Sequence, residues 1–216
     1  MSDTILAVLG ILGGLLCAVG DLFLDLKGAD NKKLGEHRII DSKWEVMPHY
    51  RFVTSTILAM FAVPMYCCGV IALSNVLAIQ APDFAAVFQW ITLIGAIGGF
   101  MIHTFLNLCP TIYQTILKEA SFELAEKVIN RIFRQIYVPF FTLYSMLVIV
   151  PAGMLVYGIV SGLLALPMWC IFLNPVVFQV VGLLLRATKQ KIFIDAPACC
   201  AASLGLGAYG VIALLI

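Results

Sequence analysis

The chain is short of charged residues. Of its 216 residues only 12% are charged, whereas 62% are hydrophobic. Soluble domains have about 25% charged and about 45 to 50% apolar residues. This composition excludes a soluble fold and predicts a protein that uses the lipid bilayer as its solvent. The net charge of +1 also excludes the strong positive field of a nucleic-acid-binding protein.

The sequence also has no paired-cysteine motif. Its seven cysteines include no Cys-x-x-Cys pair, and its three histidines are scattered without helical ligand spacing. These absences argue against a zinc site or a disulfide framework. We therefore expect the cysteines to act as small core residues, and we expect no bound metal and no cofactor. The residues before the first hydrophobic run lack the basic segment of a signal peptide. We therefore expect that run to be a permanent membrane span.

Signatures of several membrane enzyme families are missing as well. The segment 21–28 lacks the Asp-Gly and Ala-Arg pairs of CDP-alcohol phosphatidyltransferases, and only one Asp-x-x-x-Asp is present where membrane prenyltransferases use two. The Gly-x-Ser-Gly of rhomboid proteases and the Ser-Gly-His of phosphatidic acid phosphatase relatives are also absent. The sequence therefore leaves open whether the protein is an enzyme.

What the sequence does contain is a series of long hydrophobic runs. Crossing the hydrocarbon core takes about 20 residues of α-helix, and lipid excludes unpaired backbone groups, so the runs predict helices. We predict a single all-α membrane domain over residues 1–216. Its six transmembrane helices are expected at about residues 4–26, 52–79, 84–108, 137–160, 168–186 and 195–216.

The basic residues predict how these helices are oriented. All thirteen Lys and Arg residues lie in the segments 27–51, 118–134 and 186–191, which are alternate connections between the predicted helices. Positively charged loops face the cytoplasm, so these segments are predicted to be cytoplasmic, with both termini on the opposite side. Apolar and charged residues alternate at helical spacing over residues 116–136. This pattern predicts an amphipathic cytoplasmic helix between the third and fourth spans, lying on the membrane surface or running on into the fourth span.

Two acidic residues in the first span have an energetic cost that calls for an explanation. Asp21 and Asp25 are four residues apart, so they share one helical face. A charged side chain at the membrane centre costs about 2.5 to 3.5 kcal/mol, and less near a helix end. His103 and Asn107 in the third span have the same spacing and a similar predicted depth. We expect these four side chains to form a polar pocket that opens to the cytoplasm.

Each of these residues also has a structural interpretation. Asp25 can pair with Lys27 or Arg51 at the membrane surface, and His103 can simply stabilise packing through a hydrogen bond. Asp195 before Ala196 has the form of a helix N-cap, but it could also line the pocket. The candidate residues for binding a ligand or a proton are Asp21, Asp25, His103, Asn107, Asp195 and Arg51.

The sequence favours a small carrier or binding protein for an amphiphilic or ionic molecule, because few polar side chains converge in the spans. An enzyme acting on a lipid headgroup and a structural subunit without a ligand remain alternatives. The expected partners are the lipid bilayer and this small ligand, with no nucleic acid. Small-residue faces on several spans also allow contacts between copies of the chain, so a homo-oligomer remains open.

Overall fold

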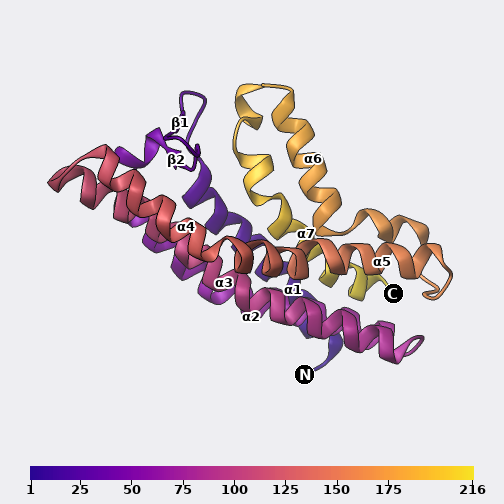
Figure 1. Ribbon diagram of the computed structural model, residues 1–216. Helices are drawn as coiled ribbons and strands as arrows, with labels where there is room; N and C mark the ends of the chain where they lie inside the picture. Colours follow the sequence, from indigo (N-terminus) through magenta and orange to yellow (C-terminus); the bar gives the residue numbers. More distant parts are fainter.

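The computed structural model describes residues 1–216 and is almost entirely helical (Figure 1). The helices are α1 Asp3–Asp25, α2 His49–Ala78, α3 Pro82–Glu119, α4 Phe122–Tyr144, α5 Val150–Val160, α6 Pro175–Ala187 and α7 Ala196–Leu215. A π-helical turn, η2 Ser145–Ile149, joins α4 to α5. Short 3-10 turns are η1 Ser42–Glu45, η3 Met168–Phe172 and η4 Lys191–Phe193. The two strands, β1 Lys33–Leu34 and β2 Ile40–Asp41, pair antiparallel with Lys33 opposite Asp41.

Five helices are long and apolar enough to cross a membrane: α1, α2, α3, the continuous helix Phe122–Val160, and α7. The predicted all-α membrane fold is confirmed in this form, as a bundle compatible with an integral membrane protein. The cytoplasmic placement of the basic segments stays a prediction. Both termini lie at the same end of the bundle, since Asn75 near the end of α2 donates to Asp3 and Gly210 packs against Ala7.

The predicted fifth span, 168–186, is not a single helix. Its first part is the 3-10 turn η3, and the chain then breaks at Asn174 before the 13-residue α6. The break has a local cause: Asn174 caps α6 by accepting hydrogen bonds from the amides of Val176 and Val177, and Pro175 occupies the first helical position. The turn and α6 together return the chain from the end of α5 to the start of α7.

The third span was predicted to end at residue 108, but α3 continues to Glu119. At 1.5 Å per residue this helix is about 57 Å long, well beyond the roughly 30 Å of a hydrocarbon core. Pro110 does not interrupt α3. The chain turns only at Ala120–Ser121, where the Ser121 hydroxyl accepts a hydrogen bond from the Leu124 amide and caps α4. In Figure 1, α3 and α4 lie side by side and extend past the bundle toward β1 and β2.

The predicted amphipathic helix is therefore the first part of α4, and it is continuous with the fourth membrane helix rather than separate from it. The π-helical turn explains how the helix passes Pro151 without breaking. Pro151 has no amide, and its ring would crowd the carbonyl four residues earlier. The wider turn shifts the hydrogen bonding by one residue, so that the Val150 amide bonds to the Ser145 carbonyl.

Glycines bring α1 into direct backbone contact with both α2 and α7. A Cβ atom on Gly10 would collide with the backbone of Gly69 in α2, and one on Gly14 would lie 2.5 Å from the Gly207 Cα in α7. In lipid, helix association depends on such close packing, because there is no hydrophobic gain from moving an apolar face out of lipid. α1 is thereby held between α2 and α7 with little freedom to slide.

Residues 27–48 fold against the extended end of α3 and α4. A separate hydrophobic core forms there and includes Ile40, Trp44 and Met47 from this segment with Tyr113 and Ile129 from the two helices. Gln114 of α3 donates to the main-chain carbonyls of both Trp44 and Met47, at 2.6 and 2.7 Å. The segment is thus a folded cap on the bundle, and it stabilises the long α3–α4 hairpin.

The packing of α1 makes a matched pair of glycine substitutions informative. Gly14→Ala should lower the free energy of unfolding by about 1 to 3 kcal/mol, because the added methyl group overpacks the contact with α7. Gly153→Ala in α5 should cause no loss, since nothing lies within 4 Å of the added atom and alanine favours a helix. Thermal unfolding in detergent measures both. Equal midpoints for the two variants would contradict the proposed packing.

Candidate functional site

A cavity of about 320 Å³ lies among the membrane helices, where the sequence predicted a polar pocket. We call it the inner cavity. Its lining comes from α1, α2, α3, α4, η2, α6 and α7. The side chains around it include Cys17, Asp21, Asp25, Tyr66, Gly99, Ile102, His103, Leu106, Phe140, Tyr144, Leu147, Val148, Gln179, Cys199, Ala202, Ser203 and Leu206. Most of this surface is apolar or aromatic, and its carboxylate and imidazole groups come from α1 and α3.

Asp21 is the central polar group of the inner cavity. One carboxylate oxygen accepts a hydrogen bond of 2.5 Å from the Ser203 hydroxyl of α7. The other lies 3.6 Å from Nδ1 of His103 in α3. The contact between Asp21 and His103 that their predicted depths implied is therefore present. No Lys or Arg side chain lies within ion-pair distance of Asp21, so its charge is balanced inside the protein only when His103 is protonated.

His103 is held from behind by two polar residues. Its Nε2 lies 2.9 Å from the Ser55 hydroxyl of α2, and the Asn107 amide donates to that same hydroxyl at 3.2 Å. When Ser55 donates its own proton to Nε2, the proton of the neutral imidazole resides on Nδ1 and faces Asp21. Asn107 is buried and does not line the cavity. Asn107, which also donates to the His103 carbonyl, therefore supports the histidine from outside the cavity.

A second, charged cavity of about 260 Å³ adjoins the inner cavity at the end where α1 finishes. We call it the vestibule. The two cavities share Asp25, Gln179, Ala198 and Cys199. The charged side chains that line the vestibule are Asp25, Lys27, Lys33, Asp41, Arg186 and Asp195. Asp25 thus stands at the boundary between a charged cavity and a largely apolar one.

Lys27 connects the carboxylates of the vestibule. Its ammonium lies 2.5 Å from Asp25 and 2.9 Å from Asp41, and Lys33 approaches Asp41 at 2.9 Å. Burial lowers the pKa of Lys27, but the two carboxylates outweigh burial and raise it. For Asp41 burial acts in the opposite direction and raises the pKa. The Lys27 charge and the hydrogen bonds from Asn31, Lys33 and Lys27 outweigh burial, so the pKa of Asp41 is lowered. Both groups therefore stay charged at neutral pH.

Asp195 and Arg51, two of the predicted ligand-binding residues, bind main-chain groups at the end of α1. Asp195 occupies the N-cap position of α7, but its side chain does not cap that helix. It accepts hydrogen bonds from the amides of Lys27 and Gly28, at 3.0 and 2.5 Å, because Gly28 turns there with a φ of +87°. The expectation of an N-cap hydrogen bond is therefore wrong. Asp195 also lines the vestibule, where it ties α7 to the end of α1.

Arg51 does not pair with either aspartate. Its guanidinium donates to the main-chain carbonyls of Leu22, Phe23 and Leu26, at 3.3, 2.9 and 2.8 Å, and so satisfies the C-terminal end of α1. A positive charge at this position is also favoured by the helix dipole. Arg51 lines neither the inner cavity nor the vestibule.

Several residues of the site were not among the sequence candidates. Ser203 and Ser55 provide hydroxyls to Asp21 and His103, and Lys27 and Asp41 form the buried ion pair of the vestibule. A lone serine in an apolar helix is usually bonded to its own backbone, so it provides no sequence signal. Asp41 could have been suspected only from its place beside apolar Ile39 and Ile40 in an otherwise polar segment.

The chain belongs to a protein family described as a family of unknown function, DUF6796, whose model matches residues 1–216. No curated protein and no solved structure matches the chain. The role of the site must therefore be inferred from its own geometry and chemistry.

The ion pair of the vestibule predicts how stability depends on pH. The lowered pKa of Asp41 means that its stabilising effect is present above its unfolded value of about 3.8 and is lost as pH falls through the folded value. Asp41→Asn should lower the free energy of unfolding by about 2 kcal/mol at pH 7. Below about pH 4 the variant should lose less stability with falling pH than the unaltered protein does. Unfolding midpoints measured from pH 7 to pH 3 test this.

Asp30→Asn is the matched control, because the Asp30 side chain is exposed and pairs only with Lys43. We expect little change in the midpoint of this variant at any pH, since exposed ion pairs are weak. If Asp30→Asn destabilised the protein as much as Asp41→Asn, a special role for the buried pair would be ruled out.

Proposed function

We propose that the protein is a small membrane carrier or binding protein for an amphiphile with a cationic head, and that the ligand occupies the inner cavity. The observation that carries the proposal is the setting of Asp21. Its carboxylate faces the cavity among apolar walls, and its one nearby cationic partner is His103. A carboxylate in an apolar membrane interior is costly unless a positive charge or a proton compensates it. A cationic ligand supplies that charge.

The rest of the lining suits the apolar part of such a ligand. Tyr66 and the pair Phe140 and Tyr144 contribute aromatic surface, and the remaining walls are largely aliphatic. Aromatic faces attract organic cations as well as apolar groups. The volume of about 320 Å³ is at the small end of the range for ligand sites, about 300 to 1,000 Å³. A small amphiphile therefore fits better than a whole phospholipid.

In this proposal the cationic ligand enters the inner cavity through the vestibule. It joins the inner cavity at Asp25, whose charge is shared with Lys27. An approaching cation first meets this partly neutralised carboxylate and then Asp21, which has no such partner. The electrostatic attraction therefore increases inward.

His103 provides a means of coupling binding to a proton. With His103 protonated, the 3.6 Å contact to Asp21 is an ion pair and competes with a cationic ligand. With His103 neutral, Asp21 is available to the ligand. Ser55 donates to Nε2 of the neutral imidazole and accepts from it when the ring is protonated, so its hydroxyl holds the ring in either state. The pair can therefore exchange a proton for a cation, as an ion-coupled carrier requires.

The alternative of an enzyme acting on a lipid headgroup has less support. No Lys or Arg lines the inner cavity, so a phosphate group would face Asp21 without a balancing charge. No group of three or more His, Cys, Asp or Glu side chains is arranged to hold a metal ion that could replace those cations.

A pair of aromatic ions of opposite charge tests the proposed ligand class. Benzyltrimethylammonium should bind to the purified protein in detergent, as measured by isothermal titration calorimetry, whereas benzenesulfonate should not. Asp21→Asn should weaken binding of the cation by about tenfold or more, which corresponds to about 1.4 kcal/mol for one lost charge interaction. His103→Gln should retain binding, because it leaves the Asp21 carboxylate in place.

Asp30→Asn provides the control, since it removes an exposed carboxylate that lines neither the inner cavity nor the vestibule. Its affinity for benzyltrimethylammonium should equal that of the unaltered protein. The proposal fails if Asp21→Asn, shown to be folded by gel filtration, binds the cation as tightly as Asp30→Asn does. Mass spectrometry of molecules that co-purify with the two variants would extend the test to natural ligands.

A further inference from the structure

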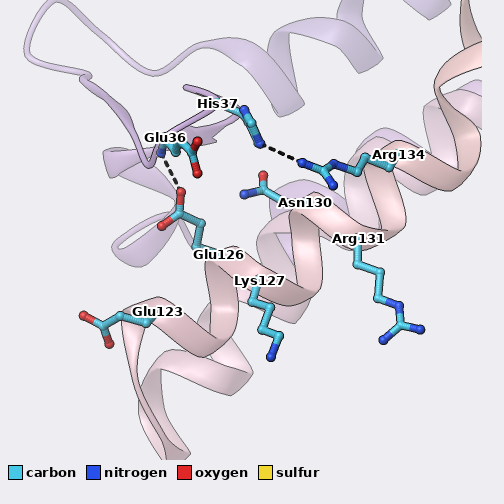
Figure 2. A pocket seen from close by; sticks show the side chains of 8 residues that line it. All are labelled: Glu36, His37, Glu123, Glu126, Lys127, Asn130, Arg131 and Arg134. Carbon is cyan, nitrogen blue, oxygen red and sulfur yellow. Dashed lines mark hydrogen bonds between the residues drawn. The ribbon is translucent and has the colours of Figure 1, made fainter.

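A second pair of hollows lies outside the helix bundle, where residues 27–48 pack on α4. One, of about 520 Å³, is lined only by polar residues, which Figure 2 shows: Glu36, His37, Glu123, Glu126, Lys127, Asn130, Arg131 and Arg134. The other, of about 450 Å³, shares His37, Asn130 and Arg134 with it and is completed by Ile39, Phe133 and Tyr137. We call the latter the α4 groove. It has a basic, polar side and an aromatic side.

We infer that the α4 groove binds an anionic phospholipid, with the phosphate held by Arg134, His37 and Asn130 and the upper part of the acyl chains lying along Phe133 and Tyr137. This site is distinct from the inner cavity, shares no lining residue with it and does not depend on its proposed ligand.

The first support is the charge of the groove. The Arg134 guanidinium donates to Nε2 of neutral His37 at 3.4 Å, and neither side chain has a carboxylate within ion-pair distance. When His37 is protonated it can only donate, so two cationic donors then converge without a carboxylate between them. Glu126, the nearest acid on α4 in sequence, is occupied by the main-chain amide of Glu36. A phosphate oxygen placed between Arg134 and His37 would satisfy both.

Figure 2 also shows where the neighbouring charges point. Arg134 extends toward His37, while Lys127 and Arg131 extend away from the residues 27–48 segment on the outer side of α4. Lys127, Arg131 and Arg134 follow one another at helical spacing, so they form a continuous basic stripe beside the groove. Such a stripe attracts the negatively charged headgroups of a membrane surface by about 1 kcal/mol per residue.

The second support is the position of the groove along α4. Arg134 is the last charged residue of this helix, and the apolar run through Val138 and Phe140 begins after Tyr137. The rise from Arg134 to Tyr137 is about 4.5 Å, roughly the distance from a phosphate toward the start of the acyl chains. Tyrosine is enriched at this level of the membrane. The order of polar and apolar groups in the groove therefore matches that of a phospholipid.

The groove is also preformed on both sides. Its loop side is held by the Glu36–Glu126 hydrogen bond and by the buried Ile40, which belongs to the hydrophobic core beneath β2. Its helix side is anchored through Ile129, which is buried in the same core. Binding of a lipid there requires little further ordering of the protein, so little conformational entropy is lost. The bound lipid would also attach the segment 27–48 to the membrane surface.

Native mass spectrometry of the full chain, stripped of lipid in detergent, tests the inference. Phosphatidylglycerol should bind about tenfold more tightly than phosphatidylcholine with the same acyl chains. Arg134→Gln should remove most of this preference, and Arg134→Lys should retain part of it, because lysine keeps the charge but loses the planar fork. Lys118→Gln, at the exposed end of α3, removes the same charge and should leave the preference unchanged.

Three results would overturn the inference. The first is equal affinity for the two lipids. The second is an equal loss in Lys118→Gln and folded Arg134→Gln, which would mean diffuse surface attraction instead of a defined site. The third is full displacement of phosphatidylglycerol by inorganic phosphate at equal concentration, which would mean an anion site that ignores the acyl chains. Binding of benzyltrimethylammonium should be unaffected by Arg134→Gln, so this site and the inner cavity can fail independently.

Discussion

The close backbone packing of α1 against α2 and α7 is the constraint on which the rest of the structure depends. Gly10 and Gly14 let the three helices touch at a separation that any larger side chain would prevent. In lipid this contact replaces the hydrophobic drive that assembles a soluble core. It also sets the height of Asp21, which then contacts Ser203 of α7 through one carboxylate oxygen and His103 of α3 through the other.

The same constraint separates two polar environments that have different roles. Deep in the bundle, Asp21 has hydroxyl and imidazole neighbours but no fixed cation, so it remains available to a ligand or a proton. At the end of α1, Lys27 and Lys33 together balance Asp25 and Asp41, and Asp195 and Arg51 hold the main chain around them. The outer polar residues are paired with one another, whereas Asp21 has no Lys or Arg partner.

Much of the fold follows from local sequence features, and the departures have identifiable causes. Hydrophobic runs predicted α1, α2 and α7 closely. Run length failed for α3, because its polar continuation is stabilised by packing against residues 27–48, which hydropathy does not register. Run length also failed for residues 168–186, because the 3-10 turn η3 ends and the helix α6 begins at Asn174 and Pro175, inside one apolar run. For the site, the similar predicted depth along the first and third spans placed Asp21 and His103 together, but it could not identify Ser203 or Ser55.

The sequence by itself determined the helical class, the presence of apolar helices long enough to cross a membrane, and the matching heights of Asp21 and His103, because these depend on composition and on the fixed rise of a helix. Only the tertiary structure decided what each polar residue does. Asp195 and Arg51 bind main-chain groups, Asn107 supports His103, and Asp41 enters a buried ion pair. Those roles depend on which helices pack together, and that choice rests on shape complementarity between segments far apart in the chain.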